Sequence, residues 1–86
     1  MMSPMSVNWT TLTTLRATPG PDILIPPATL LAITQATNLK PAVVRPALEE
    51  LVREGCVREY QTRYGKSYAR TEQGDRRIRE VREWLR

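Results

Sequence analysis

The feature that most constrains the fold of this chain is a helix-forming segment followed at once by two β-forming segments around a glycine. Residues 41–54 read PAVVRPALEELVRE, and Val44, Leu48 and Leu51 recur at the spacing of a helix with one buried face. Pro41 suits the first helical position, where a missing N–H leaves no hydrogen bond unmade. The sequence therefore predicts a core-facing helix over 41–54.

The segment after this helix predicts a basic β-hairpin. Gly55 can end the helix in the left-handed conformation, and residues 57–70 then contain two β-leaning runs. Between the runs lies Arg63-Tyr64-Gly65-Lys66, where glycine suits a turn that needs a positive φ. The hairpin contains four cationic residues and a single carboxylate, so its tip is expected to attract an anionic partner.

The chain before residue 41 predicts two more helices and a short strand. Residues 7–17 form the first helix, with Ser6 as its N-cap, and the turn Pro19-Gly20-Pro21 ends it. Its apolar residues lie three apart: Trp9, Leu12 and Leu15. The short apolar run at 23–25 is read as a small strand.

Pro26-Pro27 then opens a second helix over 28–37, and Asn38 suits the left-handed position that ends it. Three residues of this helix are expected to face the core: Leu30, Leu31 and Ile33. The link to the next helix is short, with Leu39 as an apolar peg beneath it, so residues 28–54 match a helix-turn-helix pattern.

The last part of the chain predicts a short C-terminal helix over 72–86. Thr71 can cap its start. Its arginines are interleaved with Glu80 and Glu83, which favours ion pairs within the helix.

Composition excludes several classes of function. With 86 residues the chain is expected to form a single domain over 7–86 behind a disordered tail, 1–6. It has no histidine and one cysteine, so one copy cannot build a histidine-containing catalytic triad, a histidine-ligated metal site or a Cys-rich zinc site. We therefore expect that the chain is not an enzyme and has no catalytic residue, and that it binds no cofactor, metal or small-molecule ligand. No run is long and apolar enough for a membrane span, and the start lacks signal-peptide features, so a cytoplasmic location is expected.

The charge is basic and concentrated in the second half. The net charge is +4, and residues 1–44 account for only +1 of it, from Arg16 and Lys40 against Asp22. Arginine dominates over lysine, which favours bidentate contacts with phosphates or bases. The charge alone does not decide the partner.

Three stretches resemble the PadR-like group of winged helix-turn-helix transcriptional regulators. They are Pro46-Ala47-Leu48, the acidic-basic run 49–55 ending in glycine, and Tyr68-Ala69-Arg70-Thr71-Glu72-Gln73-Gly74. MarR-like and related winged helices are close competitors. The resemblance implies an α+β fold with three helices, a small sheet with a two-stranded wing, and a short C-terminal helix. Arg70 departs from it, because the group usually has an inward-facing leucine there; the hairpin's inner face is then partly open, or the arginine reaches out to solvent.

The resemblance also implies sequence-specific binding to double-stranded DNA by a small transcriptional regulator. Helix 41–54 would enter the major groove, and wing 57–70 would lie on the backbone or in the minor groove. The outward positions of the helix supply the first set of candidate contacts: Lys40, Ala42, Arg45, Pro46 and Glu49. The wing tip supplies the second: Arg63, Tyr64 and Lys66.

Each of these sites also has a purely structural interpretation. The outer face of helix 41–54 could be a solvated surface, and cations on a hairpin can serve only to prevent edge-to-edge aggregation. Cys56 is most simply a small buried residue. A protein-interaction module, such as a subunit of a replication or recombination assembly, is the alternative to DNA binding.

A single recognition helix covers little DNA, so a homodimer on a palindromic site is also expected. The end helices provide the candidate contacts between copies: Trp9, Val81, Trp84 and Leu85. The same residues could instead seal the core of one copy.

Overall fold

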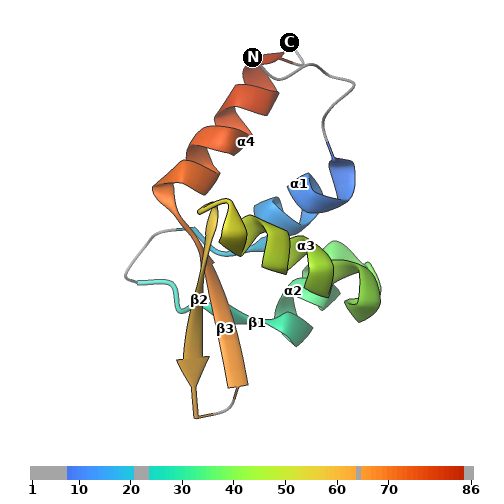
Figure 1. Ribbon diagram of the computed structural model, residues 1–86, viewed down its shortest axis with the longest axis vertical. Coiled ribbons are helices and arrows are strands. Elements are labelled where there is room, and N and C mark those ends of the chain that lie inside the picture. Colours follow the sequence, from blue (N-terminus) through green and yellow to red (C-terminus); the bar gives the residue numbers. More distant parts are fainter. Residues whose placement is uncertain (1–7, 21–23, 64, 85–86) are drawn as a thin grey trace.

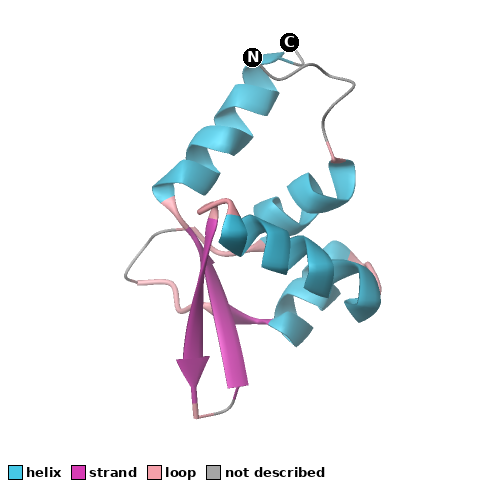
Figure 2. Cartoon of the chain, viewed as in Figure 1, coloured by secondary structure: helices cyan, strands magenta, loops and turns pink. Residues whose placement is uncertain are grey.

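The structure is a computed structural model and describes residues 8–20, 24–63 and 65–84. Over these residues the chain forms four helices and a three-stranded antiparallel sheet, an α+β arrangement in which the hairpin projects from a helical body (Figures 1 and 2). In chain order the elements are α1 (Trp9–Ala17), β1 (Ala28–Thr29), α2 (Leu30–Thr37), α3 (Pro41–Arg53), β2 (Val57–Thr62), β3 (Gly65–Arg70) and α4 (Glu72–Trp84). The expected helix-turn-helix, wing and short C-terminal helix are all present.

The first helix begins later than its sequence predicts. Asn8 is the N-cap, and its side-chain oxygen accepts a hydrogen bond from the Thr11 N–H at 3.1 Å. The prediction of Ser6 as the cap is therefore wrong, because Asn8 supplies the acceptor that the first turn needs. Ser6 itself lies outside the described residues.

The strand expected at 23–25 is also wrong. Leu24 and Ile25 lie in a turn and a bend, with 86% and 50% of their surface exposed, and Ile23 lies outside the described residues. The strand that pairs with the hairpin is β1, where Ala28 lies opposite Tyr68. Two prolines separate the apolar run from β1, and proline has no N–H to donate to a sheet.

Helix α2 begins at Leu30 because Thr29 caps it, accepting a hydrogen bond from the Ala32 N–H at 3.2 Å. Of the three residues expected in the core, Ile33 is fully buried and Leu30 packs against its edge. The expectation for Leu31 is wrong, since 65% of it is exposed: a helix turns about 100° per residue and carries this side chain away from the core. Asn38 has the expected left-handed conformation, with φ of 59°.

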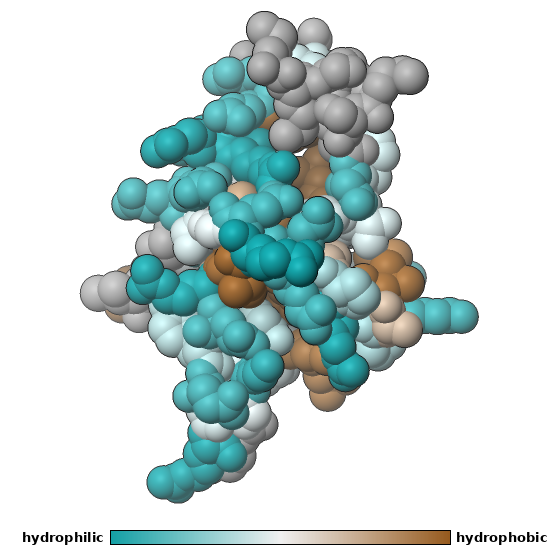
Figure 3. Space-filling model, in the orientation of Figure 1, coloured by the Kyte–Doolittle hydropathy of each residue, from teal (hydrophilic) through white to brown (hydrophobic). Residues whose placement is uncertain are grey.

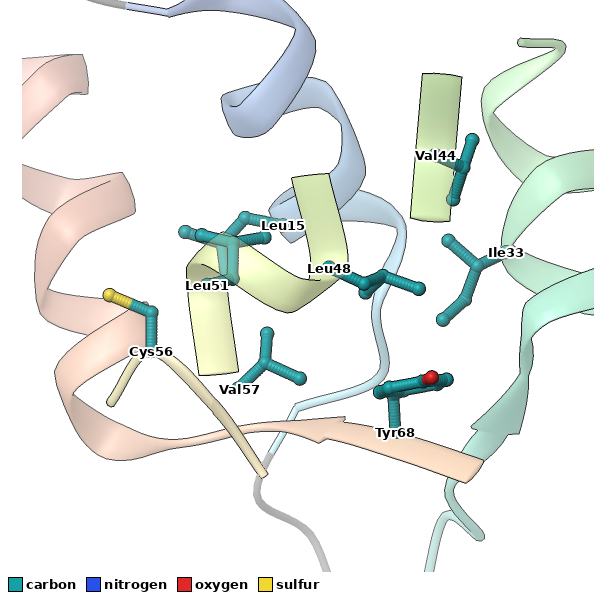
Figure 4. Close-up of a cluster of buried hydrophobic side chains, with 8 residues drawn as sticks. All are labelled: Leu15, Ile33, Val44, Leu48, Leu51, Cys56, Val57 and Tyr68. Carbon is teal, nitrogen blue, oxygen red and sulfur yellow. The ribbon is translucent and has the colours of Figure 1, made fainter. Parts of the chain in front are cut away.

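The stripe on α3 forms the centre of the core, as predicted. Val44, Leu48 and Leu51 are essentially fully buried, and each contributes roughly 1.5–3 kcal/mol by leaving water. They pack against buried side chains from the other elements (Figure 4). These are Leu15 of α1, Ile33 of α2, Cys56 just before the hairpin, and Val57 and Tyr68 of the hairpin. Leu39 packs at the edge of this cluster, as expected of the peg between the helices. The burial of Cys56 agrees with its structural interpretation.

The sheet has the order β1-β3-β2, and the alternation along its strands gives it two different faces. Val57 and Tyr68 are buried against α3 and the core. Arg58 lies opposite Ala69 in the hairpin, so these two residues, with Tyr60, project from the other face. At the turn, Gly65 has φ of 113°, the positive value predicted for it.

Arg70 neither leaves the inner face of the hairpin open nor reaches out to solvent, as expected from the sequence. Its guanidinium group instead connects β3 to α4 and to the end of α1. Nε donates to Asp75 Oδ1 of α4 at 2.5 Å, while Nη1 donates to the carbonyl oxygens of Thr18 at 3.1 Å and Leu15 at 3.4 Å. A cation at these carbonyls satisfies the C-terminal end of α1 and complements its dipole. Where the PadR-like group has an inward-facing leucine, this chain therefore has a set of polar contacts from Arg70 to Asp75, Thr18 and Leu15, which we call the Arg70 clamp.

Helix α4 is fixed onto the junction between α3 and β2. Thr71 caps it as predicted, since its hydroxyl oxygen accepts from the Gly74 N–H at 3.2 Å, and the same hydroxyl donates to the Gly55 carbonyl at 2.6 Å. Gly74 is buried so closely that a Cβ there would lie 2.3 Å from the Cys56 carbonyl oxygen. Only glycine fits between the helix and this carbonyl.

The ion pairs expected within α4 are absent among the described residues. Arg77 instead pairs with Glu54 at the end of α3 and donates to Cys56 Sγ at 3.7 Å. Burial acts to lower the pKa of Arg77, but its hydrogen bonds to Glu54 and Cys56 outweigh burial and leave the pKa above its ordinary value. The reason for the difference is that α4 lies across the C-terminus of α3, which offers a nearer carboxylate.

Candidate nucleic-acid interface

The first half of α3 presents the residues that the sequence assigns to DNA. Four of them are exposed on its outer side: Ala42, Arg45, Pro46 and Glu49. Lys40 is the N-cap residue, is exposed, and makes no side-chain capping bond. Pro46 lies inside the helix, so no N–H there bonds to the Ala42 carbonyl. The arrangement is an exposed helix start that carries two cations, one carboxylate and two apolar side chains.

The wing tip carries the second set. Arg63 is exposed in the turn and has no ion pair among the described residues. Lys66 pairs with Glu59 across the hairpin at 3.0 Å. The hydrogen bond and the charge of Glu59 raise the pKa of Lys66 above its ordinary value. The amino group of Lys66 is therefore already occupied by a carboxylate, whereas the guanidinium group of Arg63 has no such partner among the described residues. Tyr64 lies outside the described residues.

The outer stripe of α3 and the inner face of the wing act on each other electrostatically. Burial is the main reason that the pKa of Tyr68 is raised. The charges of Glu59 and Glu49 raise this pKa further, whereas those of Lys66 and Arg45 lower it. Glu49 also contributes to the raised pKa of Lys66, after the larger effects of Glu59. Glu49 of α3 and Lys66 of the wing are thus close enough to influence each other, and Figure 3 shows mainly hydrophilic side chains along the projecting hairpin.

Two charged residues have roles that sequence reasoning missed. Glu59 neutralises part of the wing, which a count of charges along the hairpin does not show. Arg58 lies on the opposite face of the sheet from Tyr68, so it does not join Lys66. Successive side chains of a strand point to opposite faces of the sheet, and this alternation could have indicated the face on which Glu59 and Arg58 each lie.

The candidate dimer residues do not form a single exposed patch. Trp9 is 53% exposed and Trp84 is half-buried, but Val81 is only 6% exposed. The expectation that Val81 is free for a partner is wrong, because it packs within the chain. Leu85 lies outside the described residues.

The described part of the chain holds no group of three or more His, Cys, Asp or Glu residues placed to bind a metal ion. In the same part of the chain, no helix combines the length and apolar character of a membrane span.

Comparison with known proteins gives structural neighbours and no relatives by sequence. No known family model matches the sequence, and no curated protein matches it either. A MarR family transcription regulator superposes with a TM-score of 0.73 at 21% identity, over 91% of this chain and 51% of the regulator. A protein of unknown function from Listeria innocua Clip11262 gives 0.73 at 17% identity, over 91% of this chain and 52% of that protein.

A third structure matches over nearly its whole length. It is a candidate DNA-binding protein from Ralstonia eutropha JMP134, with a TM-score of 0.74 at 16% identity, over 88% of this chain and 98% of that one. The present chain spans about half the length of the first two neighbours. At these identities the likeness establishes the winged-helix fold.

Proposed function

We propose that this chain is a sequence-specific double-stranded DNA-binding protein that acts as a small transcriptional regulator. The observation that carries the proposal is that the exposed start of α3 and the exposed wing tip both present cationic side chains, Lys40 and Arg45 on the helix and Arg63 on the wing. Two of its structural neighbours, a MarR family transcription regulator and a candidate DNA-binding protein, support it. We also propose a cytoplasmic, DNA-associated location.

The roles on α3 follow from the chemistry of base edges in the major groove. Arg45 has the fork geometry to donate to guanine O6 and N7, and Glu49 can accept from cytosine N4. Ala42 offers a methyl group to a thymine methyl, and Lys40 at the helix start suits a phosphate. Pro46 adds an apolar surface beside Ala42 and does not compete for hydrogen bonds.

The wing supplies contacts that do not depend on base sequence. Arg63 lies at the tip, where a cation meets phosphates or a narrow minor groove. Lys66 contributes less, because it already pairs with Glu59. Tyr64 belongs to the same proposed contact.

Two finer proposals concern the subgroup and the assembly. The motifs around Pro46 and Tyr68 favour the PadR-like group within winged-helix regulators. A homodimer would place two α3 helices in successive major grooves, about 34–36 Å apart. Trp9, Trp84 and Leu85 remain its candidate contacts, and sedimentation at micromolar concentration tests it: a mass of 9.8 kDa would exclude a stable dimer off DNA.

The direct test is fluorescence anisotropy with a labelled random duplex, repeated at several salt concentrations. Binding that weakens linearly in log K against log[salt] is expected, with a slope of about 0.9 per phosphate contact. Selection from a random-sequence library then tests specificity. If no duplex is bound even at low salt, the alternative of a protein-interaction module replaces the proposal.

A further inference from the structure

A groove of about 860 Å³ lies on the face of the sheet that points away from α3. It is lined by Ala69 of β3 and, on one side, by residues 25–27, which lead into β1 behind the hairpin in Figure 1. The opposite wall comes from β2 and the first turns of α4. Six residues form these walls: Ile25, Pro26, Pro27, Arg58, Tyr60 and Arg76. Because Arg58 and Tyr60 project away from the core face, this groove is separate from the proposed DNA surface.

The groove gathers apolar side chains that the fold leaves in solvent. Ile25 is 50% exposed and Tyr60 is 40% exposed, and they rank among the largest exposed apolar residues of the described chain. Pro26 and Pro27, which also line the groove, are exposed as well and add a stiff apolar wall. An exposed apolar cluster with a polar rim is typical of a surface that another molecule covers.

The charges at the rim select the partner. Arg58 and Arg76 are exposed, and neither has an ion pair among the described residues. Arg70 also borders the groove, but Asp75 and two carbonyls already occupy its donors. Glu72 is the one carboxylate among the described lining residues. The rim is therefore cationic, and it complements an anionic occupant with apolar groups.

The shape of the groove distinguishes between occupants of this chemistry. Small-molecule pockets enclose most of their ligand, whereas the walls here are themselves exposed. A second copy of the chain carries a net charge of +4, which disfavours contact with a cationic rim. An extended peptide needs only side-chain contacts along an open channel, because its backbone can stay hydrated.

We propose that this groove is a docking site for an acidic peptide segment of a partner protein. An aliphatic or aromatic side chain of the segment would pack between Ile25, the two prolines and Tyr60. Its carboxylates would pair with Arg58 on the wing and Arg76 on α4. Such a contact uses the face of the sheet opposite α3, so it leaves α3 free.

The test begins with a display library of random twelve-residue peptides, selected on the immobilised full-length chain. Enriched peptides should combine Asp or Glu with Leu, Phe or Trp. A labelled enriched peptide is then titrated with the wild type and with three exposed single variants, Arg58→Ser, Arg76→Ser and Tyr60→Ser. Each should weaken binding about tenfold. The matched control is Arg79→Ser, which removes an exposed arginine of α4 outside the groove and should leave affinity unchanged.

Three results would overturn the proposal. The first is a library that yields no acidic and apolar peptide. The second is an enriched peptide that binds the three groove variants as tightly as the wild type. The third is that Arg58→Ser and Arg76→Ser weaken the binding of a random duplex as much as Arg63→Ser does. The groove would then belong to the DNA surface. Loss of duplex binding in Arg63→Ser alone would leave the docking site standing.

Discussion

Replacing Gly74 by alanine should destabilise the protein, although helix propensity alone predicts the opposite. In a helix interior, alanine is more favourable than glycine by about 1 kcal/mol. Gly74 is buried, and its Cβ would lie 2.3 Å from the Cys56 carbonyl oxygen and 2.7 Å from Arg70 Cγ. Ordinary contacts of a Cβ are 3.4–4 Å, so α4 must move by about 1 Å or more.

That movement cannot be local, because the same carbonyl accepts the Thr71 N–H at 2.9 Å and Arg70 is held by Asp75. Forcing atoms into a packed site costs typically 1–3 kcal/mol, and weakening these hydrogen bonds adds about 1 kcal/mol each. After subtracting the gain in propensity, we expect a net loss of about 2–4 kcal/mol. For a domain of this size, that lowers Tm by roughly 8–30 °C.

Urea unfolding and thermal melts followed by circular dichroism measure this difference. Glu80→Ala is the matched control, because it places alanine at an exposed position of the same helix and should change stability by less than about 0.5 kcal/mol. A Gly74→Ala variant as stable as the wild type, or more so, would refute the close approach of α4 to the start of the hairpin.

Four further substitutions test the clamp and the proposed DNA surface. Arg70→Met keeps the side-chain stem but removes the ion pair with Asp75 and two helix-capping bonds, so urea unfolding should show a loss of about 2 kcal/mol, and none would contradict the clamp. Arg63→Ala should reduce the slope of log K against log[salt] for duplex binding by about 0.9, and Lys66→Ala should reduce it by less because Lys66 already pairs with Glu59. If both variants have the same slope as the wild type, the wing is not part of the interface. Arg45→Ala should cost about 1–3 kcal/mol on a selected site and much less on random DNA, and equal losses would make it a phosphate contact.

The elements that the sequence predicts well are those whose signals are local and strong. Helix α3 repeats its apolar stripe from Val44 to Leu51, about two turns, and Asn38 and Gly65 adopt the positive φ that their positions call for. The surface stripe around Arg45 follows directly, since one buried face of a helix defines the exposed one.

The failures share a cause, which is that the deciding partner lies elsewhere in the chain. A run of three apolar residues at 23–25 carries no periodicity that distinguishes a strand from an exposed turn. Arg70 reaches carbonyls more than fifty positions away in the sequence, at Leu15 and Thr18, and Glu59 reaches Lys66 across the hairpin. Neither contact can be read from spacing along one element.

The groove beside the wing was not predicted for the same reason. Its walls come from the chain before β1, from β2 and from α4, and only the folded hairpin brings them together. A strand residue such as Tyr60 can be assigned to a face from its neighbours, but what lies across that face depends on the whole fold.

The measurement that tests the central claim most directly is a titration of the isotope-labelled protein with a random duplex of about 20 base pairs, followed by amide chemical shifts. We expect shifts concentrated at the start of α3 and at the wing tip, namely at Lys40, Ala42, Arg45, Glu49, Arg63 and Lys66, and these shifts should fade as salt is raised. Shifts confined to Ile25, Arg58, Tyr60 and α4, or no shifts at low salt, would contradict it.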